Sequence, residues 1–204
     1  MLHDAYLPFL CRVVYRMGMP ATANDWTVEM LDALPDDGRR HEIIDGELFV
    51  TPAPREVHQL IVGALYWRLV QYLTGHGVGQ SLVSPADVRR GDRLRNRVQP
   101  DILVVRLTGG MRPGYPYELH DLLLAVEVVS PSNPFLDYQV KRDLYLREGV
   151  AEYWVINPDA RNVSRWHGRD DPGEVLSKEV VWNPDGMPAP FVLDLAAFFT
   201  DALS

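Results

Sequence analysis

Two acidic residues inside apolar runs are the feature of this sequence that points most directly to chemistry. Glu127 lies within LLLAVEVVS, residues 122–130, and Asp101 lies near the start of VQPDILVV, residues 98–105. Continuous apolar runs of this kind are typical of strands buried on both faces. An ionised carboxylate there is costly unless a cation pairs with it or it binds a metal ion. Two such acids on successive strands can be neighbours in a sheet, where they repel unless a cation lies between them.

The types of ligand predict which metal ion would bind, and a nearby lysine would supply a second positive charge. Oxygen ligands without a cysteine or histidine cluster favour Mg²⁺ or Mn²⁺. In the next predicted helix, Asp137, Lys141 and Tyr145 form a stripe at i, i+4 spacing. Lys141 is expected at the border of the buried face, where it would orient or help deprotonate a water, or stabilise charge on a phosphate. The alternative is that Glu127 is a buried acid paired with Lys141 or an arginine, without catalysis.

The elements that would position these residues follow from turns and caps. Asp45-Gly46 within HEIIDGELFV predicts a β-hairpin. Thr27 is expected to cap a short helix, and Asp194 a C-terminal one. Further helices are predicted from residue 54 to 75 and over 135–148, and strands over 78–88, 98–105, 122–130 and 151–158, with a hairpin around HGRDDPG. The order predicts an α/β (α+β) fold with a central mixed β-sheet flanked by helices, an N-terminal hairpin, and a C-terminal hairpin plus helix.

Length and composition limit the class of protein. The 204 residues suit one domain over 25–204, with 1–24 as a peripheral segment. No apolar run has the length of a membrane span, so no membrane association is expected. The single cysteine, Cys11, excludes an internal disulfide framework, is expected to be inert, and suits the cytoplasm. The net charge of −8 counts against broad, non-specific binding to nucleic acid.

One segment is strongly basic in spite of that net charge. RRGDRLRNR, residues 89–97, holds five arginines in nine residues and is expected to form an exposed hairpin tip. This segment concentrates the positive charge that would contact phosphates, so Arg93, Arg95 and Arg97 are candidate DNA contacts. The alternative is an ordinary solvated loop.

Several of these motifs together resemble the PD-(D/E)XK nuclease superfamily, which has the restriction-endonuclease-like fold, and more narrowly the Uma-two family of endonucleases. The resemblance rests on Pro100-Asp101, on EVVSPS at 127–132 and on DYQVKRDLYLREGVAEYWVINP at 137–158. HEIIDGELFV and the following proline-rich turn with His58 also match, and coverage runs from about Trp26 to the end.

The resemblance implies Mg²⁺- or Mn²⁺-dependent hydrolysis of DNA. Asp101 and Glu127 would hold the metal, Glu42 would add a further acid, and Lys141 would position the attacking water. Such proteins often form homodimers, although the sequence itself shows no dimer. His58 is expected to support the site without carrying the reaction, and Glu42 taken alone is expected to be an exposed strand residue.

One departure from the superfamily pattern concerns the lysine. The pattern would place it two positions after the acid, where this chain has Val129. Within the narrower family the lysine role is assigned to the following helix, and Lys141 matches that position. Two alternatives therefore stay open: a catalytically inactive module that keeps the fold for binding or regulation, and a hydrolase of a small phosphorylated substrate.

Overall fold

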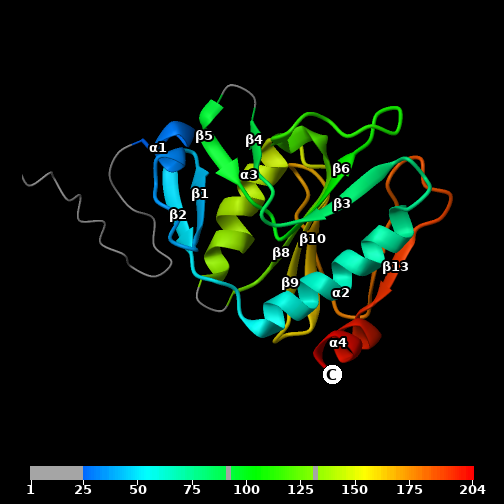
Figure 1. Cartoon of the computed structure of the whole chain (residues 1–204). Helices are drawn as coiled ribbons and strands as arrows, with labels where there is room; N and C mark the ends of the chain where they lie inside the picture. Colours follow the sequence, from blue (N-terminus) through cyan, green and yellow to red (C-terminus); the bar gives the residue numbers. More distant parts are fainter. Residues whose placement is uncertain (1–24, 91–92, 131–132) are drawn as a thin grey trace, which may run out of the picture.

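The computed structural model describes residues 25–90, 93–130 and 133–204, and of Arg93 and Leu94 only the backbone. The expected peripheral segment 1–24, with Cys11, lies outside the described residues. The described chain has the predicted α+β composition, with helices flanking mixed and antiparallel sheets (Figure 1). In that part of the chain, no helix is long and apolar enough to cross a membrane.

A six-stranded mixed sheet forms the centre of the molecule. Its strand order is β11-β10-β9-β8-β6-β3, in which β8 is parallel to β9 and antiparallel to β6. Every residue of β8 is buried, as its apolar run predicts. The strands are β3 (Gly79–Val83), β6 (Ile102–Arg106), β8 (Leu122–Val128), β9 (Tyr153–Asn157), β10 (Asn162–Trp166) and β11 (Glu174–Leu176).

Helices cover both faces of this sheet (Figure 1). On one face, α2 (Glu56–Leu73) and α4 (Leu195–Leu203) pack with the short sheet of β12 (Glu179–Trp182) and β13 (Phe191–Asp194). On the other face lie a π-helix, η2 (Leu136–Lys141), and α3 (Arg142–Arg147). Tyr153 and Trp154 of β9 are fully buried and point into opposite cores, because successive strand residues alternate in direction.

A second, five-stranded sheet lies beside the first, in the order β2-β1-β5-β4-β7. The predicted hairpin is confirmed, because Asp45 and Gly46 both adopt positive φ and join β1 to β2 in a two-residue turn. The strands are β1 (Arg40–Ile44), β2 (Glu47–Thr51), β4 (Val88–Arg90), β5 (Arg93–Val98) and β7 (Tyr117–Glu118), which is followed by the 3₁₀ turn η1 (Leu119–Asp121).

Both predicted helix caps are confirmed. Thr27 precedes α1 (Val28–Asp32), and its side chain accepts a hydrogen bond from the Met30 N–H. Asp194 precedes α4 and accepts one from the Ala197 N–H at 2.9 Å. These contacts satisfy amide groups that the first turn of a helix leaves without partners.

Three predictions of local structure were inaccurate. The strand expected over 78–88 is divided into β3 and β4, which belong to different sheets, and Pro85 between them has no N–H to continue a ladder. The arginine-rich tip is largely strand, because β4 and β5 pair along it. The helix over 135–148 begins as a π-helix, which periodicity did not predict.

Candidate active site

The central sheet places the two predicted acids next to each other. Asp101 immediately precedes β6, and Glu127 is the second-last residue of β8. These strands pair with Ile102 opposite Val126, as expected from their order in the chain. The N–H of Val128 donates to Oδ2 of Asp101 at 2.8 Å, which links the two positions directly. Both acids are buried, with exposed fractions of 3% and 1%.

Asp101 is surrounded by hydrogen-bond donors. Arg40 Nη1 lies 2.8 Å from its Oδ1, and His58 Nε2 lies 2.9 Å from its Oδ2. Burial acts to raise the pKa of Asp101, but the His58 hydrogen bond and the Arg40 charge outweigh it and hold that pKa well below its usual value. Asp101 is therefore ionised over the physiological range. His58 contacts the acid, as expected of a supporting residue.

Glu127 has a different environment. Lys141 Nζ lies 3.0 Å from its Oε1, and the Tyr145 hydroxyl donates to the same oxygen at 2.8 Å. Burial raises the pKa of Glu127 well above its usual value, and the charge of Lys141 opposes that rise only in part. Lys141 and Glu127 lie within ion-pair distance, so the pairing weighed from the sequence as the alternative to a metal ligand is seen in the structure.

Lys141 is buried between two acids, not at the border of a buried face as the sequence suggested. Its Nζ lies 2.9 Å from Glu42 Oε2 and 3.0 Å from Glu127 Oε1, and the residue is 2% exposed. Burial by itself would lower the pKa of Lys141, but the charges of Glu127 and Glu42 more than offset this and raise it. The ammonium group therefore remains charged.

Lys141 is the last residue of the π-helix η2. In a π-helix the backbone bonds run from residue i to i+5, so each turn is wider, and such turns recur at functional sites. Here Asp137 and Lys141, four residues apart, are both buried and both line the same pocket. The Tyr153 hydroxyl donates to the Asp137 carbonyl at 2.9 Å. This bond ties η2 to the central strand β9.

Glu42 was expected from its position alone to be exposed, and that expectation was wrong. It is fully buried on β1, its Oε1 accepts from the Gln99 N–H at 2.8 Å, and its Oε2 is held by Lys141 through charge, without a hydrogen bond. Glu42 does not line the pocket. Its role as a metal ligand, implied by the resemblance, stays a prediction.

Two residues of the site were not among those predicted. Asp137 is 7% exposed and lines the pocket, and burial raises its pKa to about 7 against the opposing charge of Lys141. Its i, i+4 spacing to Lys141 was the available indication. Arg40 binds Asp101 from the strand that carries Glu42. Because Arg40 and Glu42 are two positions apart on β1, they share a face of that strand.

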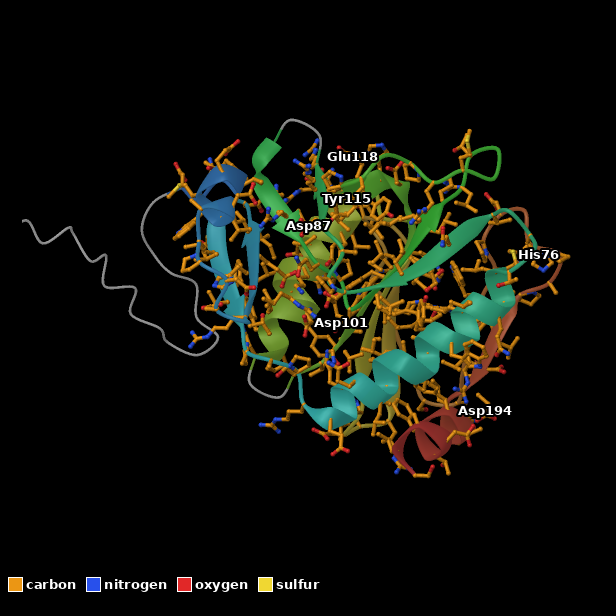
Figure 2. All side chains as sticks on the ribbon, viewed as in Figure 1. His76, Asp87, Asp101, Tyr115, Glu118 and Asp194 are labelled. Carbon is orange, nitrogen blue, oxygen red and sulfur yellow. The ribbon has the colours of Figure 1, made fainter. Side chains whose placement is uncertain are left out.

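These residues surround one pocket of about 450 Å³. Asp101, Glu127 and Lys141 all line it, so the structure brings the three principal predicted residues together. Figure 2 shows Asp101 in the space between α2 and the helices η2 and α3. Within residues 25–90, 93–130 and 133–204, no three His, Cys, Asp or Glu side chains are grouped closely enough to hold a metal ion by themselves.

The described part of the arginine-rich tip does not line this pocket, and two of its arginines form ion pairs with acids. Arg95 Nη2 lies 2.7 Å from Asp25 Oδ1, and Arg97 forms an ion pair with Asp32. The side chain of Arg93 lies outside what the structure describes. None of the three lines the pocket, so DNA contact through Arg93, Arg95 and Arg97 stays a prediction.

The fold and the arrangement of two acids with a lysine define a protein of the restriction-endonuclease-like class. Residues 28–196 match the model of the Uma2 family, described as "Putative restriction endonuclease", and the chain belongs to this family. The fold is similar to that of a crystal structure described as a putative nuclease belonging to DUF820 from Anabaena variabilis ATCC 29413. The TM-score is 0.70 at 18% identity, covering 87% of this chain and 99% of that one. No curated protein matches the chain.

Proposed function

We propose that this protein hydrolyses phosphodiester bonds of DNA with the help of a divalent cation. The observation that carries the proposal is the convergence of Asp101, Glu127 and Lys141 in one pocket of a chain that belongs to the Uma2 family. Buried acids of this kind are rarely retained without a partner or a function. The pocket lies where β8 and β9, which are parallel, end, a usual place for ligand sites in sheets with helices on both faces.

The donor set suits Mg²⁺ or Mn²⁺. Magnesium is commonly bound by one or two carboxylates together with waters and substrate phosphates, without a complete protein cage. Asp101 and Glu127, adjacent in the sheet, supply two carboxylates, and the pocket beside them has room for waters and a phosphate. When bound, the cation would neutralise charge on the scissile phosphate and lower the pKa of the attacking water.

Lys141 would act through its charge. Because its pKa is raised, it is a poor base, and the proposed role is to stabilise negative charge on the phosphate and to orient the attacking water. Glu42 would hold the ammonium in place, and metal ligation is its second proposed role. His58 and Arg40 would fix the orientation of the Asp101 carboxylate.

The second candidate is an inactive module that binds or regulates. The observation in its favour is that protein cations already accompany all three acids: Arg40 pairs with Asp101, and Lys141 pairs with both Glu42 and Glu127. Such a network is electrostatically satisfied without a metal ion. A homodimer is part of the first proposal alone.

Plasmid nicking tests the proposal. With Mg²⁺, the wild-type protein should convert supercoiled DNA to the nicked form. Asp101→Asn should slow the reaction by at least about a hundredfold, since it weakens the proposed metal site. Asp170→Asn, at an exposed acid in the turn after β10, is the matched control and should retain full activity. Equal nicking rates for the wild type and Asp101→Asn would refute the assignment of Asp101 to the site, and no nicking with either Mg²⁺ or Mn²⁺ would support the inactive module.

A further inference from the structure

The charged groups of the site lie at the bottom of the pocket. Asp101, Glu127 and Lys141 are only 1–3% exposed. The pocket's volume of about 450 Å³ is in the range of sites that enclose a single small ligand, about 300–1,000 Å³. An intact duplex is too wide to follow its phosphate to that depth, whereas a flexible single strand can bend into the pocket.

The upper walls of the pocket are largely apolar. Pro52, Pro54 and Val57 come from the segment that joins β2 to α2 and from the first turn of α2, and Val129 and Pro158 follow the ends of β8 and β9. Val57 is 44% exposed on this rim. A pocket with apolar walls and a few polar groups suits a flat, largely apolar group that those polar groups orient. An unpaired nucleobase has such a face, whereas in a duplex the faces of the bases are stacked on each other.

Among the residues that the structure describes, the cations lining the pocket are too few to hold a length of duplex. Binding to duplex DNA depends on many contacts between phosphates and Lys or Arg. Within residues 25–90, 93–130 and 133–204, three cationic and four acidic side chains line the pocket: Arg40, Arg55 and Lys141, and Asp101, Glu127, Asp137 and Asp159. Arg40 and Lys141 already pair with the carboxylates of the site. The lining therefore provides a place for one phosphate near a bound cation, not for a series of them.

We propose that the substrate is single-stranded or locally unpaired DNA. One nucleobase lies against the apolar rim, and the adjoining phosphate reaches the charged floor. This inference rests on the proposed function and narrows its substrate class. It also accounts for an acidic protein that acts on DNA, because a base held in a pocket replaces part of the attraction that a basic surface gives to a duplex.

Binding tests this choice directly. Fluorescence anisotropy would compare a labelled twelve-residue oligothymidylate, a strand of equal length made of abasic units, and a labelled hairpin duplex. The titrations would be made in Ca²⁺, which takes the same oxygen ligands as Mg²⁺. We expect the oligothymidylate to bind about tenfold more tightly than either other probe, the loss that follows from one missing base contact. A duplex that binds as tightly as the oligothymidylate, or an abasic strand equal to it, would overturn the inference.

A pair of variants tests the rim itself. Val57→Thr keeps the shape of the side chain but adds a hydroxyl on the apolar wall, and Val192→Thr makes the same change at a 56% exposed position on β13. The first variant should weaken binding of the oligothymidylate severalfold and leave the abasic strand unchanged. The second should change neither. Unaltered oligothymidylate binding by Val57→Thr, or an equal loss for both strands, counts against a base at this wall.

Cleavage separates this inference from the proposed function. With Mg²⁺, single-stranded circular DNA should be cut at least about tenfold faster than the relaxed duplex circle. Faster cutting of the duplex would refute the substrate class and leave the nuclease assignment intact. Failure to cut either circle, with wild-type folding verified by circular dichroism, would refute both.

Discussion

The two carboxylates of the site are neighbours in one sheet but differ sharply in their surroundings. Asp101 meets Arg40 and His58, which are themselves 19% and 16% exposed, and it also accepts a backbone N–H. Glu127 meets Lys141 and Tyr145, both buried, and the charge of Lys141 is shared with Glu42. The pKa of Asp101 is lowered and that of Glu127 is raised. The number of donors around a buried acid, more than burial alone, decides its charge.

The comparison suggests distinct roles for two halves of the site: the Asp101 half, with Arg40 and His58, and the Glu127 half, with Lys141, Tyr145 and Glu42. The Asp101 half holds a fixed negative charge beside partly hydrated cations. The Glu127 half is a closed cluster in which one lysine compensates two acids, so its charge depends on Lys141. Metal binding would affect the second half more, because a cation beside Glu127 would take over part of the role that Lys141 now has.

The largest expected effect comes from removing that lysine. Lys141→Met should destabilise the protein by about 3–5 kcal/mol, since it leaves Glu42 and Glu127 buried without their cation. Urea unfolding measures the change, and Lys178→Met, at an exposed position, is the control. Lowering the pH should recover part of the loss as the acids take up protons. A cost below about 1 kcal/mol would mean that the cluster is less tightly coupled than its distances indicate.

A smaller effect is expected from magnesium. Mg²⁺ at a hundredfold excess over its dissociation constant should stabilise the wild-type protein by about 2.7 kcal/mol. It should stabilise Glu127→Gln much less, because one of the two proposed ligands is weakened. Lys141 keeps Glu42 as a partner in that variant, so the metal-free stability should fall by less than in Lys141→Met. The experiment compares thermal melts of both proteins in EDTA and in Mg²⁺. No magnesium effect on the wild type would exclude the metal site and leave Glu127 as an ion-pair residue.

The smallest expected effect is the pH dependence of stability, and its sign differs between Asp101 and Asp137. The pKa of Asp101 is lowered by folding, so the stability it contributes is present above its unfolded pKa of about 4 and is lost as the pH falls through the folded value. The pKa of Asp137, beside Lys141, is raised to about 7. Folded Asp137 therefore binds a proton that the unfolded chain has released, and this contribution is lost as the pH rises from about 4 to 7.

Two variants separate these contributions. Arg40→Met should cost about 1 kcal/mol at neutral pH, since His58 and the Val128 N–H remain on Asp101, and should make acid unfolding begin at a higher pH. Asp137→Asn should flatten the decline in stability between about pH 4 and pH 7. Urea unfolding over that range measures both. If Arg40→Met instead changed the stability only near neutral pH, Asp101 would not be the group that folding holds ionised.

The local elements were predictable because their determinants are local. Asp45-Gly46 specifies a two-residue hairpin turn, since both positions need positive φ. Thr27 and Asp194 cap helices through side chains that reach amides three residues away. The apolar run of 122–128 forms a central strand, because only a strand covered on both faces buries every residue.

The sequence by itself determined most of the elements, the neighbouring acidic strands and the residues able to do chemistry. The tertiary structure decided their charges and partners. Glu42 became buried because β1 lies against β5, which is distant in sequence, and Lys141 at the end of η2 lies between Glu42 and Glu127. Such outcomes depend on which cations and donors reach a carboxylate from other elements. Electrostatic energy depends on distance and solvent exposure, and neither is encoded in the spacing along one strand or helix.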